Sequence, residues 1–328
     1  MTQTNLSIFI PHIGCPHRCS FCDQRSISGT AKPPRGEDVA RLLSEQAEHL
    51  TERGMKAEIA FFGGSFTAVP RGYMLELLEA ADEGLRKYGC YNGIRCSTRP
   101  DCISEEIILL LKKYGVTAVE LGAQSMSDEV LRLNERGHSA EDVRRAARLI
   151  SESGIELGLQ MMTGLYGDTP QRCRETAGEF IKLKPQTVRI YPTVILKGTR
   201  LGELFESGEY ASFGFDETAA LCAELLREFN SAGIRVIRMG LHASPQVERD
   251  KLGGVYHPAF REIVESRLFL EDMKKELLQR EKGDYVILTD PKNISKAVGQ
   301  KRANIAAMKA LGYNIAVKPL EGEYIKVR

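Results

Sequence analysis

The chain has 328 residues, of which 42% are hydrophobic and 27% are charged, and its formal net charge is +1. This composition is typical of a globular protein with one large domain and a second, smaller one. No apolar run approaches membrane-spanning length, and the first five residues lack the basic start of a signal peptide, so we expect a cytoplasmic protein without membrane contact.

Short β-branched or aliphatic runs alternate along the chain with segments whose apolar residues recur at helical spacing. The strand candidates are 7–11, 57–62, 93–98, 116–122, 155–162 and 187–191. The helix candidates are 37–53, 70–88, 104–114, 139–153 and 171–183. This alternation predicts an α/β fold in which a parallel sheet is connected by crossover helices.

Three cysteines, Cys15, Cys19 and Cys22, directly follow the first predicted strand. Three thiolates on one loop can hold three irons of a [4Fe–4S] cube, whereas a fully ligated electron-transfer cluster takes four cysteines. The fourth iron would then be open to a substrate or cosubstrate, as at catalytic metal sites. The alternatives are a zinc knot, with His12 or His17 as fourth ligand, and a set of buried thiols.

The spacing CxxxCxxC, with the aromatic Phe21 before the last cysteine, resembles the radical S-adenosylmethionine (SAM) superfamily. The resemblance implies that SAM binds the open iron of a [4Fe–4S] cluster and is cleaved by an electron from it. The product is a 5′-deoxyadenosyl radical that abstracts hydrogen from the substrate, while the protein positions the reactants. The resemblance also implies a partial (β/α)6 TIM-type barrel and a reductant such as flavodoxin or ferredoxin.

Gly63, Gly64 and Ser65 follow the second predicted strand and match the family's "GGE" position. Glycine there permits the backbone to approach the SAM amino group closely, and serine replaces the family's glutamate. Active sites of such barrels lie at the C-terminal ends of the strands, where both the cysteine loop and these glycines are expected.

Further segments resemble one branch of the superfamily, the radical SAM domain of the Elongator catalytic subunit, over roughly 7–240. They are 97–101, 119–125, 134–138, 189–193, 197–199 and 201–210. Gln124 and Arg136 match positions that contact SAM in related oxygen-independent coproporphyrinogen oxidases, and Gln160 stands where those oxidases bind ribose. We therefore assign Phe21, Gly63, Gly64, Ser65, Gln124, Arg136 and Gln160 to cofactor binding, and we assign no catalytic side chain.

Elongator proteins continue into an acetyltransferase domain, but no glycine-rich pyrophosphate loop follows residue 240 here. The resemblance therefore does not imply transfer from acetyl-CoA. Nor does a cysteine follow Cys222 that could carry a methyl group, as it does in RNA adenine methylases. The five cysteines outside the motif have no tight spacing and are expected to be reduced.

The last 55 residues, from Lys274 onward, contain 12 Lys and Arg against six Asp and Glu. This net charge of +6, on a body that carries −5, favours a polyanionic partner. We predict three parts: a barrel over 1–240, a linking segment and helix over 241–283, and a small α/β domain over 284–328.

The segment 294–305, with Gly299 and Arg302 at the two glycine positions of a GxxG loop, resembles a KH module of the transcription factor NusA. KH modules clamp a single-stranded backbone at this loop between two helices. The resemblance implies that Lys296, Lys301 and Arg302 contact RNA phosphates. The alternative is a small α/β cap that closes the barrel.

Together these features predict a radical SAM enzyme that modifies a nucleotide of tRNA or rRNA. One alternative is radical chemistry on a small molecule, with the tail as a lid. Another is a non-catalytic iron–sulfur protein that binds RNA.

Overall fold

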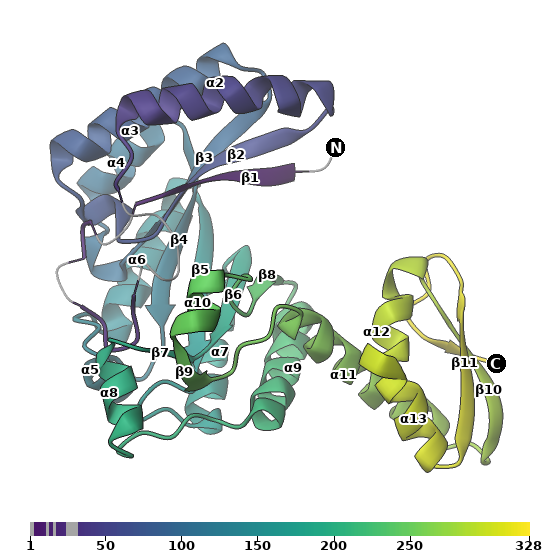
Figure 1. Ribbon diagram of the computed structural model, residues 1–328. Helices are drawn as coiled ribbons and strands as arrows, with labels where there is room; N and C mark the ends of the chain where they lie inside the picture. Colours follow the sequence, from purple (N-terminus) through teal and green to yellow (C-terminus); the bar gives the residue numbers. More distant parts are fainter. Residues whose placement is uncertain (1–2, 11–12, 16–17, 24–31) are drawn as a thin grey trace.

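The computed structural model describes residues 3–10, 13–15, 18–23 and 32–328. Its largest element is a curved, parallel sheet of seven strands in the order β1-β2-β3-β4-β5-β6-β8 (Figure 1). The strands are β1 Gln3–Phe9, β2 Lys56–Phe62, β3 Tyr91–Thr98, β4 Val116–Gln124, β5 Glu156–Thr163, β6 Thr187–Pro192 and β8 Arg235–Met239. Because β1 and β8 are its two edges, the sheet is a partial TIM-type barrel, as predicted.

Crossover helices cover the outer face of the sheet (Figure 1). They are α2 Gly36–Glu52, α3 Arg71–Lys87, α4 Glu105–Lys113, α6 Ala140–Ser153, α7 Pro170–Leu183 and α9 Phe215–Ser231. Their apolar stripes pack on fully buried strand residues such as Ile59, Ile94 and Leu157, which accounts for the alternation of strand and helix patterns in the sequence.

The six predicted strands are all present, but the sheet has a seventh, β8, that the periodicity did not predict. Its sequence, Arg235 to Met239, is short and has arginines at its first and fourth positions. It therefore lacks the continuous apolar character of a buried parallel strand. Pairing with β6 identifies it as a strand. The first strand also begins earlier than expected, at Gln3.

Shorter elements surround the C-terminal ends of the strands. They are η1 Phe66–Ala68, η2 Pro100–Cys102, α5 Asp128–Leu133, β7 Val194–Leu196, α8 Arg200–Glu206, α10 Pro245–Asp250 and β9 Lys251–Gly254. The strands β7 and β9 form a two-stranded antiparallel sheet. None of the helices in the described residues is long and apolar enough to cross a bilayer.

A separate unit follows the long helix α11, Phe260–Leu277 (Figure 1). It contains β10 Gly283–Thr289, η3 Pro291–Asn293, α12 Ile294–Val298, η4 Gln300–Arg302, α13 Ala303–Ala310, β11 Tyr313–Pro319 and β12 Lys326–Val327. In its sheet, β10 is parallel to β11 and antiparallel to β12. This mixture of strands and helices is the α/β composition expected for the tail.

Helix α11 contributes to two hydrophobic cores. Phe260 and Val264, near its start, belong to the core of the barrel. Met273 and Leu277, near its end, pack with residues of β10, α13 and β11. Because one helix serves both cores, the division of the chain at 240 and 283 stays a prediction.

Candidate cofactor site

A cavity of about 480 Å³ lies at the C-terminal ends of the barrel strands. All three motif cysteines line it, together with residues from all seven strands of the barrel and from the loops that follow them. Of the predicted cofactor-binding residues, those that line it are Phe21, Gly63, Gly64, Gln124, Arg136 and Gln160. Segments more than 140 residues apart in the sequence therefore meet at the place expected for a barrel site.

The cysteine loop is fastened to the barrel by main-chain and side-chain hydrogen bonds from Ser20. Its N–H and hydroxyl donate to the main-chain and side-chain oxygens of Asn134, at 3.2 and 2.8 Å. The N–H of Leu201 donates to the Ser20 carbonyl at 2.7 Å. These bonds join the loop to two segments named in the Elongator resemblance.

Gly64 is required by the backbone beside it. It has a φ of +55°, and a Cβ there would lie 2.4 Å from the carbonyl oxygen of Ile13 and 2.8 Å from that of Ile10. A side chain would thus collide with the start of the cysteine loop itself. Because Gly64 has no side chain, that loop can lie against the end of β2.

Ser65 is the predicted cofactor residue that does not line the cavity. Its side chain is fully buried, and its hydroxyl lies 2.9 Å from Thr98 Oγ1 and accepts the Arg99 N–H at 3.2 Å. The serine therefore joins the end of β2 to the end of β3. A contact between its hydroxyl and SAM stays a prediction.

Gln124 and Gln160 lie next to each other on β4 and β5. The Gln160 amide donates to Gln124 Oε1 at 3.1 Å, and Gln124 has a left-handed φ of +68°. Non-glycine residues in this conformation are uncommon and often mark functional sites. The conformation ends β4 with a buried amide at the cavity wall.

Arg136 contacts the cysteine motif directly. Its Nη1 donates to the Sγ atom of Cys19 at 3.0 Å, Nη2 donates to the carbonyl of Gly122 at 2.5 Å, and the guanidinium lies 6.0 Å from the Phe21 ring. Its buried Nε has no hydrogen-bond partner among the described residues. A cation with one free donor thus faces the cysteines.

Arg99 is a second such cation, to which sequence analysis gave no role. It forms a bidentate ion pair with Asp101, in which Nε and Nη2 donate to the two carboxylate oxygens at 3.0 and 2.8 Å. Its buried Nη1 has no partner among the described residues. Its position directly after β3, at the edge of the sheet that also carries the cysteines, was a signal that could have identified it.

These residues affect the ionisation of the cysteines. Burial raises the pKa of the Cys15 thiol and Cys19 raises it further, whereas the charges of Arg136 and Arg99 lower it. Metal ligation requires the thiolate. The two arginines therefore favour iron binding by Cys15, whereas burial of the thiol opposes it.

The described residues fit a cluster with an open iron. Three thiols line one cavity, and two arginines place unused donors beside them. Among the described residues, no three His, Cys, Asp or Glu side chains are grouped for a single metal ion. His12 and His17, the zinc ligands considered above, lie outside the described residues.

Two further charged residues of the cavity were missed. Glu120 on β4 and Arg189 on β6 form a buried ion pair, and Glu120 also contacts Arg95, which pairs with Glu58 and Glu156. The available signal was the presence of charged residues inside apolar strand sequences, because buried charges in proteins are almost always paired.

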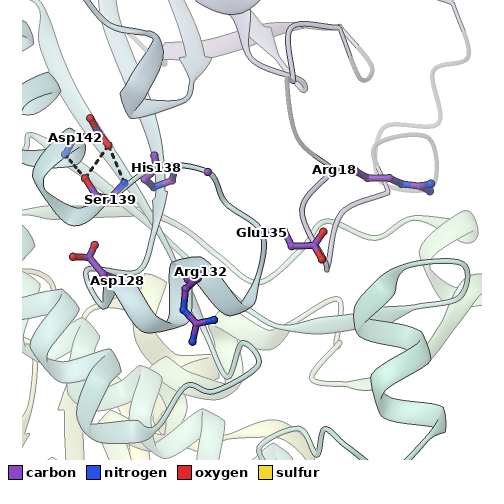
Figure 2. A pocket seen from close by; sticks show the side chains of 8 residues that line it. Arg18, Asp128, Arg132, Glu135, His138, Ser139 and Asp142 are labelled. Atoms are coloured by element: carbon purple, nitrogen blue, oxygen red, sulfur yellow. Dashed lines mark hydrogen bonds between the residues drawn. The ribbon is translucent and has the colours of Figure 1, made fainter.

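A second hollow, of about 970 Å³, lies beside the loop after α5 (Figure 2). Its lining includes Arg18, Arg132, Glu135 and His138, and the side chains surround an open space without converging on one point. Burial, with Arg136 and Arg99, lowers the pKa of His138 to about 4, so this ring is neutral near pH 7. The hollow contains none of the motif cysteines.

The predicted RNA-binding residues differ in their surroundings. Lys296 forms an ion pair with Glu265 of α11 at 2.9 Å. Lys301 and Arg302 are exposed, have left-handed φ angles of +51° and +63°, and take part in no ion pair among the described residues. Two free cations therefore project from the turn between α12 and α13.

Comparison with known families identifies the class of protein. The Radical SAM superfamily matches residues 9–180, and the Radical_SAM C-terminal domain matches residues 185–269. The chain belongs to the radical SAM superfamily, whose members bind a [4Fe–4S] cluster and SAM. These are the cofactors expected from the sequence.

More specific relatives include a tRNA uridine(34) acetyltransferase and an Elongator complex protein. The chain is 31% identical over 242 residues to a tRNA uridine(34) acetyltransferase of Methanocaldococcus infernus, covering 62% of this chain and 45% of that protein. It is 30% identical over 201 residues to human Elongator complex protein 3, covering 56% and 37%. The chain thus spans less than half the length of either protein.

Two other comparisons concern an archaeal protein and a solved structure. An uncharacterized protein of Methanocaldococcus jannaschii, MJ0486, is 30% identical over 232 residues, which is 66% of this chain and 70% of that protein. The structure of archaeal Elp3 from M. infernus, lacking residues 1–46, superposes with a TM-score of 0.63 at 21% identity, covering 85% of this chain and 64% of that one. This similarity confirms the fold.

Proposed function

We propose that this protein is a radical SAM enzyme that modifies a nucleotide of an RNA, either tRNA or rRNA. The main support for radical SAM chemistry is the Arg136–Cys19 contact, within a cavity that the other two motif cysteines and Gly64 also line. When bound, the cluster supplies the electron that cleaves SAM to the 5′-deoxyadenosyl radical. A reductant such as flavodoxin or ferredoxin would supply that electron.

The chain's own residues hold and orient the cofactors in this proposal. Cys15, Cys19 and Cys22 ligate three irons, and the backbone at Gly64 keeps their loop against β2. Gln124, Gln160 and Arg136 offer amide and guanidinium groups to the polar parts of SAM. The surrounding apolar side chains, such as Met162 and Leu196, exclude water from the radical.

An RNA substrate is supported by the relatives and by the charge of the tail. The relatives include a tRNA uridine(34) acetyltransferase and human Elongator complex protein 3. The turn with Lys301 and Arg302 gives two free cations that suit phosphate oxygens. Lys296 would have to exchange its ion pair with Glu265 to join them.

We place the reaction in the cytoplasm, where thiols are kept reduced. Residues 284–328 would act as a KH-like RNA-binding domain. The alternative role of a lid has less support, because no residue beyond His242 lines the cavity among the described residues.

The proposal is tested by comparing modified nucleosides in total RNA from a wild-type and a deletion strain by mass spectrometry. We expect one nucleoside to be lost or replaced by its precursor. The purified protein should then restore it in RNA from the deletion strain and produce 5′-deoxyadenosine. Identical nucleoside profiles would contradict an RNA substrate, and deoxyadenosine formation without RNA change would favour a small-molecule substrate.

A further inference from the structure

The part of the cavity formed by the last strands of the sheet has its own chemistry. β6, β8 and the loop after β8 contribute Arg189, Tyr191, Arg238 and His242 to the lining. In strand order, β8 is the strand farthest from β1, which the cysteine loop follows. This end is therefore available to a second ligand when the cofactors occupy the cysteine end.

Two arginines are neighbours at this end. Arg189 and Arg238 are partners in the parallel ladder between β6 and β8, and both line the cavity. Like charges in such cross-strand positions repel each other unless other groups compensate them.

Only one of the two arginines is neutralised. Arg189 pairs with Glu120 at 2.6 Å and lies over the Phe62 ring, 4.9 Å from its centroid. The Nε of Arg238 donates to the carbonyl of Gly240 at 3.1 Å, and no carboxylate pairs with this arginine among the described residues. One guanidinium charge at the cavity wall is left uncompensated.

Positive charges predominate in the lining of the cavity. Four arginines line the cavity, Arg99, Arg136, Arg189 and Arg238, against a single carboxylate, that of Glu120. Arg99 pairs with Asp101 and Arg136 contacts Cys19, so both are engaged at the cysteine end. An anion that enters from the side of β8 would meet Arg238.

We propose that Arg238 forms an anion subsite that binds a phosphate group of the substrate nucleotide. A guanidinium presents paired N–H donors that match the oxygens of a phosphate. The apolar side chains of Met162, Val194 and Leu196 line the same cavity and can contact a base. This inference rests on the proposed function, because it takes the substrate to be a nucleotide.

The test compares a ligand with and without its phosphate. Binding of uridine 5′-monophosphate and of uridine is measured by calorimetry with the reconstituted, SAM-loaded protein, for the wild type and Arg238→Gln. The matched control is Arg235→Gln, which removes the same charge from an exposed position of the same strand. Arg238→Lys, which retains the charge, serves if the glutamine variant does not fold.

We expect wild type and Arg235→Gln to bind the monophosphate at least about tenfold more tightly than uridine, since hydrogen bonds to charged groups are worth more than neutral ones. Arg238→Gln should lose this preference, and Arg238→Lys should retain part of it. Equal or undetectable binding of both ligands by the wild type would overturn the proposal. So would a preference that survives Arg238→Gln.

Failure here differs from failure of the proposed function. If nucleoside profiles from the deletion strain change but the phosphate preference is absent, the RNA proposal stands and the Arg238 subsite is wrong. If the phosphate preference depends on Arg238 but the RNA is unchanged, the subsite stands and binds a phosphorylated small molecule.

Discussion

Glu120 on β4 and Arg189 on β6 form an ion pair across the intervening strand β5. The guanidinium makes two contacts with the carboxylate, at 2.6 and 2.8 Å. Gly158 is the ladder partner of Glu120, and a Cβ there would lie 2.9 Å from Glu120 Cγ and 3.0 Å from Thr187 Oγ1. The missing side chain at Gly158 leaves the space that the Glu120 side chain occupies.

Replacing Gly158 by alanine should therefore disturb this pair. A methyl group in a buried, filled position forces neighbours to shift, and we expect a loss of about 1–3 kcal/mol in the free energy of unfolding. Denaturant unfolding measures this loss. Gly178→Ala on α7 is the control, because a Cβ there meets nothing within 4 Å. Equal stability of the two variants would contradict the packing described here.

The motif cysteines should hold the cluster. Anaerobically reconstituted protein is expected to contain about four irons and to cleave SAM when reduced. Replacing Cys15, Cys19 and Cys22 together by alanine should abolish both, as measured by iron analysis and deoxyadenosine assay. Cys222→Ala, in the buried face of α9, should retain the iron. SAM cleavage by the triple variant would end this assignment.

Gly64→Val should impair cluster assembly as well as SAM binding. The sequence position of Gly64 by itself predicts an effect on SAM binding alone, with the cluster still assembled. The structure changes that expectation, because the new side chain would collide with main-chain oxygens of Ile10 and Ile13 at the cysteine loop. Iron content after reconstitution measures the effect, with Gly72→Ala, where a Cβ meets nothing, as control. Full iron content with weakened SAM binding would restore the earlier expectation.

Arg99 and Asp101 should change the reduction potential of the cluster in opposite directions. A cation near the cluster stabilises the added electron, so Arg99→Gln should lower the potential. Asp101→Asn removes the carboxylate that neutralises Arg99 and should raise it. Redox titration monitored by electron paramagnetic resonance gives both values. Shifts of the same sign in protein with full iron content would indicate a structural role only.

Lys301 and Arg302 should contribute to RNA affinity through phosphate contacts. Changing both to glutamate should weaken binding and reduce the slope of log affinity against log salt by about 1.4 or more, since each contact to a single strand accounts for about 0.7. Gel-shift titrations at two salt concentrations measure both effects. Lys309→Glu with Lys318→Glu reverses the same charge at other exposed positions of the tail. An equal effect of the two double variants would mean that total charge, and not this turn, binds RNA.

Much of the fold could be predicted from local sequence. The period of apolar residues predicted six of the seven barrel strands, because these strands bury one face or both. It did not predict β8, whose two arginines interrupt the apolar pattern. That strand is stabilised by its pairing with β6, which is 40 residues or more away in the sequence.

The candidate site divides in the same way. The spacing of Cys15, Cys19 and Cys22 was sufficient to predict the cluster loop, because three ligands on one short segment need no distant partner. Which residues face each other on separate strands decides the roles of Gly64, Ser65 and Arg99. It also decides that Glu120 pairs with Arg189 across β5. Sheet register and strand order decide those neighbours, and neither leaves a local period in the sequence.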